Sequence, residues 1–309
     1  MGSYVSLHFP YSISKLATLH RTANSLFSKS SSIFQHHLRL HRCCYTDRVL
    51  YASASIDASR ATQLRSTDLV ALEYADLNLP CKVSGELGHV RIRQHVNPLS
   101  SSNIVPVQVP DWNEVYKDPT LPLMVDIGCG SGRFLLWLAR RNHGSGNYLG
   151  LEIRQKLVKR AEFWVKELAL KNTYFMFANA SVSFKQLVST YPGPLVLVSI
   201  LCPDPHFKKR HQKRRVVQKP LVDSIVKSLI NGGKVFMQSD VLEVALDMRN
   251  QFDAELDTLQ HIDAIDPSVL CDEEGWLLNN PMGIRTEREI HAEFEGAKIF
   301  RRMYQKRYD

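Results

Sequence analysis

The sequence predicts an α/β fold in which helices cover both faces of a mostly parallel sheet. From residue 121 onward, apolar runs of strand length alternate with helical patterns, which is typical of a sheet with crossover helices. The first run, residues 121–127, ends in glycines at alternate positions, Gly128, Gly130 and Gly132. Glycines there let the backbone turn sharply and approach a ligand closely. Sheets of this kind bind ligands at the carboxyl ends of their strands, near the first strand.

The first half of the predicted domain alternates between strands and helices. After the strand at 121–127, apolar residues at helical spacing predict a helix over 131–142, and a short apolar run predicts a second strand at 147–152. A helix over 154–170 and a third strand at 173–178 complete this half. The first two strands are therefore each followed by a predicted helix long enough to cross over to a parallel neighbour.

The second half begins with the strongest strand of the sequence. Residues 195–201 read Leu-Val-Leu-Val-Ser-Ile-Leu, a run that suits a buried strand. The expected elements after it are a helix over 216–230 that ends at Asn231-Gly232-Gly233, a strand at 234–238, a helix over 241–255, and a strand near 297–304 with a hairpin partner before it. These elements complete a single large domain at residues 121–309.

The residues before this domain fall into two parts. Residues 1–46 contain no Asp or Glu, five Lys or Arg, and nine Ser. This composition is typical of an organelle transit peptide, with an ordinary disordered tail as the alternative. We expect a chloroplast location, with the mitochondrion as the alternative. Residues 47–120, rich in proline near their end, are expected to form an N-terminal arm.

Charge and cysteine usage limit the classes of function. The net charge is +8, and seven Lys or Arg lie between Lys208 and Lys219 without any acid. Such a basic loop indicates a polyanion partner, although charge runs are also common on solvated faces. None of the six cysteines forms a C-x-x-C pair, so we expect neither a zinc site nor another metal site. No apolar run approaches the length of about 20 residues that a membrane span needs.

Polar or glycine residues end five consecutive predicted strands, which favours a cofactor site over a purely structural turn. Arg133 stands where dinucleotide-binding turns have their third glycine, and it is too bulky for close helix–strand packing there. Glu152 ends the second strand and can accept hydrogen bonds from ribose hydroxyls, which suits S-adenosylmethionine, a cofactor without a pyrophosphate. We expect the amide of Asn179 to meet the adenine edge. The expected cofactor contacts are Asp126, Gly128, Gly130, Glu152, Ile153, Asn179, Ala180 and Leu201.

A second motif follows the strongest strand. In Pro203-Asp204-Pro205, two prolines fix the backbone around one acid. Methyltransferases that act on exocyclic amines place an acid or amide with prolines at this point, whereas a turn or helix-capping role for Asp204 is the alternative. The basic loop comes next, so we expect phosphate binding beside the reacting base.

Together these segments resemble the tRNA (guanine-N7-)-methyltransferase family. The resemblance spans about residues 89–304. It rests on residues 126–134, 150–154, 179–180 and 203–215, on residues 91–99 of the arm, and on the T-x-x-E motif at 286–289. It implies a Rossmann-like, seven-stranded class I methyltransferase fold. It also implies methylation of the seven-nitrogen of a guanosine in the tRNA variable loop, with S-adenosylmethionine as the methyl donor.

The resemblance further implies roles for single residues. Asp204 would hold the edge of the guanine and offset the positive charge that forms on its ring. The expected substrate contacts are Lys208, His211 and Arg214 with tRNA phosphates, and Asp240, Thr286 and Glu289 with guanine or tRNA. Eukaryotic nuclear members work with a β-propeller partner and bacterial members act alone; we expect a monomer and keep a partner subunit as the alternative.

Two other functions are weighed against this interpretation. A nicotinamide-dependent oxidoreductase is disfavoured by Arg133 and by the absence of a plausible proton donor near the strand ends. An RNA-binding protein with a degenerate cofactor site is disfavoured because the residues at the strand ends are intact.

Overall fold

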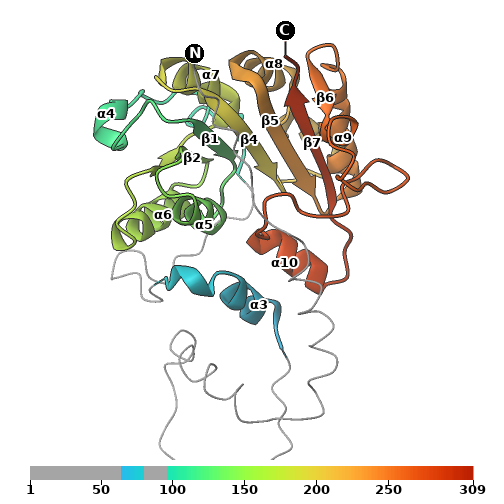
Figure 1. Ribbon diagram of the computed structural model, residues 1–309, viewed down its shortest axis with the longest axis horizontal. Helices are drawn as coiled ribbons and strands as arrows, with labels where there is room; N and C mark the ends of the chain where they lie inside the picture. Colours follow the sequence, from blue (N-terminus) through green and yellow to red (C-terminus); the bar gives the residue numbers. More distant parts are fainter. Residues whose placement is uncertain (1–63, 80–95, 309) are drawn as a thin grey trace, which may run out of the picture. The chain divides into compact units, whose positions relative to one another are not determined.

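The computed structural model describes residues 64–79 and 96–308 of the chain (Figure 1). The predicted transit peptide, residues 1–46, lies outside these described residues. So do residues 47–63 and 80–95 of the predicted arm, which include most of residues 91–99. Seven strands form one sheet in the order β3-β2-β1-β4-β5-β7-β6. The order reverses on either side of β1, and β7 runs antiparallel to both of its neighbours. This is the seven-stranded class I methyltransferase fold that the sequence predicts.

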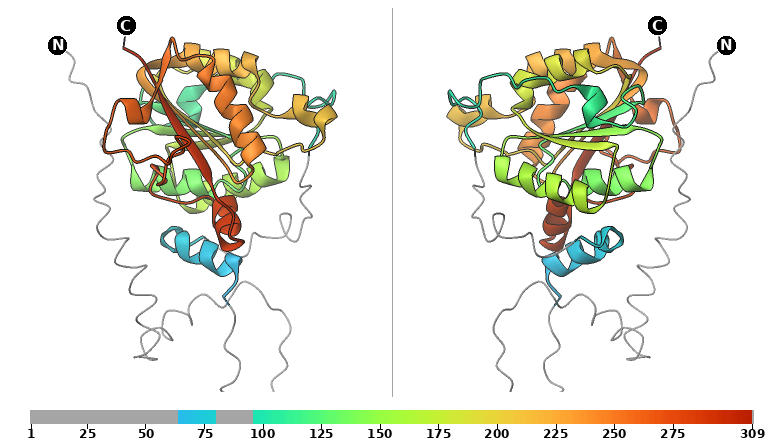
Figure 2. Two further views of the ribbon diagram at one scale, coloured as in Figure 1. Left: turned by 90° about the vertical axis from the view of Figure 1, so that its right-hand side faces the viewer. Right: turned by 90° about the vertical axis from the view of Figure 1, so that its left-hand side faces the viewer.

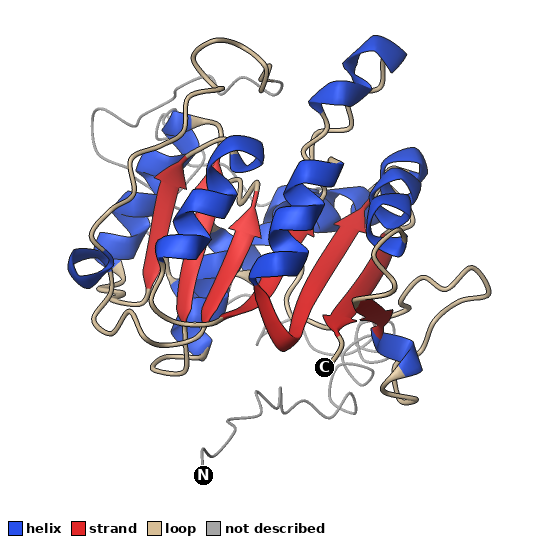
Figure 3. Cartoon of the chain, turned by 90° about the horizontal axis from the view of Figure 1, so that it is seen from above, coloured by secondary structure: helices blue, strands red, loops and turns tan. Residues whose placement is uncertain are grey.

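Figure 3 shows the strands side by side in one twisted sheet. The strands are β1 Leu123–Ile127, β2 Asn147–Glu152, β3 Thr173–Phe177, β4 Leu195–Leu201, β5 Leu229–Ser239, β6 Leu259–His261 and β7 Phe300–Lys306. The α-helices are α3 Ser66–Glu73, α4 Trp112–Val115, α5 Arg133–Arg141, α6 Gln155–Glu167, α7 Ala180–Thr190, α8 Lys219–Ser228, α9 Leu242–Asp253 and α10 Glu287–Phe294.

Helices cover both faces of the sheet, as expected from a core on each side. One apolar cluster joins the sheet to α7, α8 and α9, and the other joins it to α3, α5, α6 and α10 (Figure 2). Residues of β1 alternate between them: Val125 packs in the first cluster and Met124 in the second, because successive side chains of a strand point to opposite faces. The strand β1 is therefore buried between the two apolar clusters.

Several elements differ from the sequence expectation, and the first of them lie in the middle of the domain. Helix α7 was not predicted, because its residues include several Ser and β-branched side chains that are weak helix formers; it is stabilised by burial of Phe184, Leu187 and Val188. Helix α8 ends at Ser228, and the Asn-Gly-Gly segment lies inside β5, where the pairing with β4 shifts register. Gly232 there has a φ of +79°, so the glycines serve an irregularity in the strand rather than a helix stop.

The C-terminal strand is also placed differently from the expected hairpin. The strands that pair with β7 are β5 and β6, which both lie before α10 in the sequence, so neither is joined to β7 by a short turn. Part of the predicted arm packs on this C-terminal region. The Tyr74 hydroxyl beside α3 donates to the backbone carbonyl of Arg285 at 2.5 Å, and the Glu73 carboxylate accepts from the Arg285 guanidinium at 2.5 Å.

Candidate active site

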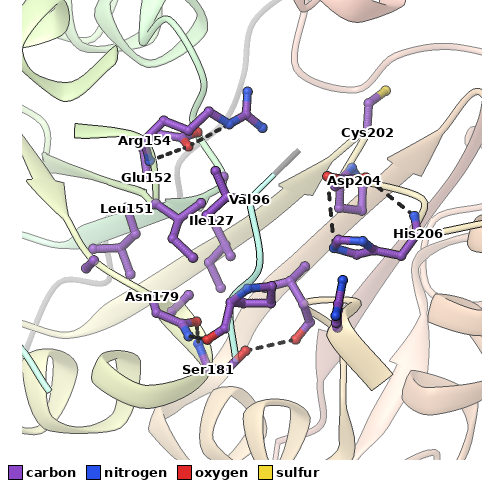
Figure 4. A pocket seen from close by; sticks show the side chains of 18 residues that line it. Val96, Ile127, Leu151, Glu152, Arg154, Asn179, Ser181, Cys202, Asp204 and His206 are labelled. Atoms are coloured by element: carbon purple, nitrogen blue, oxygen red, sulfur yellow. Dashed lines mark hydrogen bonds and ion pairs between the residues drawn. The ribbon is translucent and has the colours of Figure 1, made fainter. Parts of the chain in front are cut away.

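A pocket opens at the carboxyl ends of β1, β2, β3 and β4, where the strand order reverses (Figure 4). Its walls come from six segments of the chain. The lining residues are Val96, Pro98, Ile127, Gly128, Leu151, Glu152, Ile153, Arg154, Ala178, Asn179, Ala180, Ser181, Cys202, Pro203, Asp204, His206, Arg214 and Val216. The pocket therefore joins the predicted cofactor residues to the predicted catalytic acid.

The glycine turn after β1 has the backbone conformation that requires glycine. Gly128 has a φ of +78°, and a Cβ atom added to it would meet nothing within 4 Å, so its pocket side is open space. Gly132 has a φ of +82°, and an added Cβ would lie 2.8 Å from the Phe175 ring and 2.9 Å from Ala161. Gly132 thus provides the close packing against β3 and α6. The close packing that dinucleotide-binding turns obtain from their third glycine is thus supplied one position before Arg133.

Arg133 itself points away from this contact. Its guanidinium bonds to the Glu287 carboxylate and lies 4.8 Å from the centre of the Trp164 ring. Glu287 also accepts a hydrogen bond of 2.7 Å from the Ser131 hydroxyl. The positive charge of Arg133 and these hydrogen bonds lower the pKa of Glu287 despite its burial. The start of α10 is therefore tied to the glycine turn.

Glu152, at the end of β2, fixes the other side of the turn. Only 2% of this residue is exposed, and burial raises the pKa of its carboxyl group while the nearby Arg154 opposes that shift. One carboxylate oxygen accepts the backbone N–H of Gly130 at 3.0 Å, and the other accepts the backbone N–H of Arg154 at 2.9 Å. The carboxylate is held rigidly at the pocket wall, as preorganised binding requires.

Asp126, unlike Glu152, does not line the pocket. Its carboxylate accepts a 2.6 Å hydrogen bond from the buried Ser199 hydroxyl, across the β1–β4 pair. Burial raises the pKa of Asp126 to about 7. The structure brings five of the predicted cofactor residues to the pocket wall, namely Gly128, Glu152, Ile153, Asn179 and Ala180, and it leaves Asp126, Gly130 and Leu201 outside the lining.

The Pro-Asp-Pro motif forms the opposite wall. Cys202 leaves β4 with a φ of +49°, and Pro203, Asp204 and His206 follow it along the pocket. The Asp204 carboxylate accepts the backbone N–H of His206 at 3.4 Å, and its second oxygen lies 3.9 Å from the His206 imidazole (Figure 4). The side chain of Asp204 is 17% exposed, so the acid reaches the pocket space.

The side chains of the basic loop beyond this wall differ in their exposure and their contacts. Lys208 is exposed and Arg214 lines the pocket. Partial burial and the neighbouring positive charges of Arg214 and Arg210 lower the pKa of His211. Arg215, in contrast, is buried and anchors the loop. Its guanidinium donates to the Pro205 carbonyl at 2.9 Å, to Asp247 at 3.1 Å and to Glu243 at 2.5 Å.

The T-x-x-E motif starts a helix. The Thr286 hydroxyl accepts the backbone N–H of Glu289 at 3.2 Å, and the Glu289 carboxylate accepts the backbone N–H of Thr286 at 3.1 Å, which is a capping box. Glu289 is fully buried. Three more side chains donate to its carboxylate: Gln238 at 3.0 Å, Asn280 at 3.1 Å and Arg301 at 2.6 Å. Neither Thr286 nor Glu289 lines the pocket.

Asp240, just after β5, also lies outside the pocket lining. Its carboxylate accepts from the Arg288 guanidinium at 3.1 Å and 2.5 Å. Arg154 also lines the pocket, although no role was predicted for it. It directly follows Glu152 and Ile153 and belongs to the segment 150–154 on which the family resemblance rests.

Within residues 64–79 and 96–308, no cluster of three or more His, Cys, Asp or Glu side chains has an arrangement that could hold a metal ion. Among these described residues, no helix combines the length and the apolar character that crossing a membrane requires.

Comparisons with known proteins identify the family. A family model described as a putative methyltransferase matches residues 120–302. The tRNA (guanine-N(7)-)-methyltransferase of a Synechocystis strain is 47% identical over 204 residues, which cover 66% of this chain and 92% of that protein. The protein of the same name from Synechococcus elongatus is 44% identical over 219 residues, covering 71% of this chain and 97% of that protein.

Solved structures match more distantly. An rRNA methylase from Streptococcus thermophilus covers 63% of this chain and 91% of its own chain, with 13% sequence identity and a TM-score of 0.38. The sequence relatives match over nearly their whole length, and this sets aside both the oxidoreductase and the non-enzymatic binding protein. The chain is an enzyme that belongs to the tRNA (guanine-N7-)-methyltransferase family.

Proposed function

We propose that this enzyme transfers the methyl group of S-adenosylmethionine to the seven-nitrogen of a guanosine in the tRNA variable loop. The observation that carries the proposal is that Glu152 and Asp204 line one pocket at the switch point of the sheet. An acid for the ribose and an acid for the guanine thus face a common space, as methyl transfer between a nucleoside cofactor and a base requires.

The pocket wall fits the cofactor. The backbone beside Gly128 is open to a ligand, and a Glu152 carboxylate held by two backbone N–H groups retains lone pairs for ribose hydroxyls. Ile153 and Ala180 line the same wall and supply apolar contact. When bound, S-adenosylmethionine supplies a methyl group on a positively charged sulfur, and this group passes to the lone pair of the guanine seven-nitrogen.

Asp204 is the proposed catalytic residue. The seven-nitrogen carries a free lone pair, so no general base is needed to remove a proton before attack. A carboxylate can accept from the ring N–H and the amino group of guanine, and this contact orients the nucleophile. The same negative charge offsets the positive charge that develops on the ring. The flanking prolines hold Asp204 in place for both tasks.

Lys208, His211 and Arg214 are proposed to bind tRNA phosphates. They follow the catalytic acid directly, and Arg215 anchors their loop to α9. Cationic side chains at such a position give affinity that depends on salt. In the same proposal, Asp240 contacts the tRNA in exchange for its pair with Arg288. Thr286 and Glu289 then contribute by fixing the start of α10, because the Glu289 carboxylate is fully buried.

The location and the assembly complete the proposal. Residues 1–46 would direct the chain to the chloroplast, and the enzyme would act there as a monomer without a β-propeller subunit. A fluorescent fusion of residues 1–60 should enter plastids, whereas its retention in the cytosol or nucleus contradicts the chloroplast location. Mitochondrial entry would favour the alternative organelle.

The reaction is tested with the purified chain alone, bulk tRNA and radiolabelled S-adenosylmethionine. We expect label in 7-methylguanosine, and chemical cleavage at that nucleoside should map it to the variable loop. Label in another nucleoside contradicts the proposed reaction, and cleavage elsewhere in the tRNA contradicts the proposed position. Activity that depends on an added subunit contradicts the monomer.

A further inference from the structure

Residues 96–107 form an irregular segment, with turns between residues 98 and 103, that supplies one wall of the pocket, and we call it the arm segment. Val96 and Pro98 line the pocket from this segment, opposite the strand ends. The segment contains a turn of its own: the backbone N–H of Ser100 and the side-chain amide of Asn103 both donate to the Asn97 carbonyl, at 3.2 Å and 2.9 Å. A wall that comes from outside the sheet needs attachment to the sheet.

Asn179 provides that attachment. It lies between β3 and α7 and is 9% exposed. Its side-chain nitrogen donates to the Pro98 carbonyl at 3.0 Å and to the Asn103 carbonyl at 3.0 Å. Its side-chain oxygen accepts the backbone N–H of Ser181 at 3.1 Å, as the N-cap of α7. Both donors of the amide are therefore used within the protein.

We infer that Asn179 is a positioning residue whose amide latches the arm segment over the cofactor pocket, instead of recognising adenine through that amide. The inference concerns the role of the arm segment in cofactor binding, so it rests on the proposed function. A second tie lies farther along the same segment, where the Val107 backbone N–H donates to the Ser183 hydroxyl at 3.2 Å. Helix α7 thus holds the arm segment at both ends.

The contacts of Asn179 with the arm segment can be removed without removing its cap of α7, because they use different atoms of the side chain. An aspartate caps helices as well as an asparagine does, but it has no donor for the two carbonyl groups. Asn179→Asp therefore keeps the Ser181 contact and turns two attractive contacts with the arm segment into repulsive ones. A residue that only caps α7 would tolerate this change.

The first measurement is hydrogen exchange of the full chain without cofactor. In Asn179→Asp, we expect the backbone N–H groups of Ser100, Asn103 and Val107 to exchange about 10-fold to 100-fold faster, since they would lose an enclosing contact. Protection of α7 should stay unchanged. Unchanged exchange in the arm segment overturns the latch.

The second measurement is the kinetics of methyl transfer. Asn179→Asp should raise the KM for S-adenosylmethionine roughly 5-fold to 20-fold and leave kcat within about threefold, because the latch shapes the wall and does not touch the reacting atoms. Faster exchange with an unchanged KM would also overturn the role in cofactor binding. If the wild-type enzyme does not bind S-adenosylmethionine, the proposed function fails, while the exchange experiment still decides whether the amide holds the arm segment.

A matched control is Asn142→Asp. The amide of Asn142 donates to the Leu138 carbonyl at 3.0 Å at the end of α5, so this variant also loses one amide donor to a backbone carbonyl. It should alter neither exchange in the arm segment nor the KM. If Asn179→Asp does not fold, Asn179→Ser keeps a capping oxygen without the charge and is measured in its place.

Discussion

Asp126 offers a test of how the centre of the sheet tolerates an acid. Its carboxyl is buried in β1 and bonded to Ser199, and burial raises its pKa from the ordinary value of 3.8 to about 7. The native state therefore retains a proton that the unfolded chain releases near pH 3.8. The stabilisation from this difference is complete below pH 3.8 and is lost as the pH rises through about 7.

The size of the effect follows from the shift. One pKa unit corresponds to about 1.4 kcal/mol, so the ionisation of Asp126 should destabilise the native state by about 2 to 3 kcal/mol between pH 5 and pH 8. Asp126→Asn removes the ionisation and keeps an oxygen that can accept from Ser199. The free energy of unfolding of the variant, relative to wild type, should therefore rise by that amount across this range.

Urea denaturation at several pH values from 5 to 8 measures this difference. Asp118→Asn is the control, because Asp118 is exposed and its pKa is lowered by hydrogen bonds from Thr120; its curve should run parallel to that of wild type in this range. Parallel curves for wild type and Asp126→Asn would refute the reasoning. We also expect Asp126→Asn to change S-adenosylmethionine affinity by less than about threefold. A loss of tenfold or more would mean that Asp126 contacts the cofactor.

Three further variants test the pocket. Glu152→Ala removes charged acceptors, each worth about 1.5 to 3 kcal/mol, so calorimetry should show roughly 10-fold to 100-fold weaker S-adenosylmethionine binding; unchanged binding would take Glu152 out of the site. Asp204→Asn should slow single-turnover methyl transfer about 100-fold to 1000-fold, with cofactor binding nearly unchanged; a rate within about threefold of wild type would leave Asp204 as a turn residue only. Replacing Lys208, Arg210 and Arg214 together by alanine should weaken tRNA binding and reduce the slope against log salt by about 3; a fall in cofactor affinity instead would mean that the loop is structural.

The fold could be predicted where the sequence pattern is local. The strands β1 to β4 are short, mostly apolar runs, and the helices α5 and α6 repeat apolar residues at helical spacing. The parallel half could therefore be predicted from composition and spacing. Helix α7 could not be predicted, because burial of Phe184 and Leu187 outweighs weak helix propensity. The pairing of β7 with β6 depends on contacts across a long intervening segment, which no local pattern records.

The site was predictable where a residue must lie at a strand end. Glu152 and Asp204 both reach the pocket because the carboxyl ends of parallel strands share one edge. Asp126 also lies near the end of its strand, but the alternation of side chains directs its carboxylate toward Ser199. The separation of Arg215 from its basic neighbours depends on Glu243 and Asp247 of α9, which are distant in sequence. The local sequence therefore does not distinguish the buried Arg215 from its more exposed basic neighbours.

The position of β7 also constrains how the enzyme is made. The strand β7 lies between β5 and β6, so the sheet cannot be completed until synthesis has passed Lys306. Before then β5 exposes an unpaired edge, which is a site for association with other chains. Arg301 of β7 is also the residue that neutralises the buried Glu289. A chain that stops before residue 300 leaves this carboxylate short of a partner, so truncated products should be unstable rather than partly active.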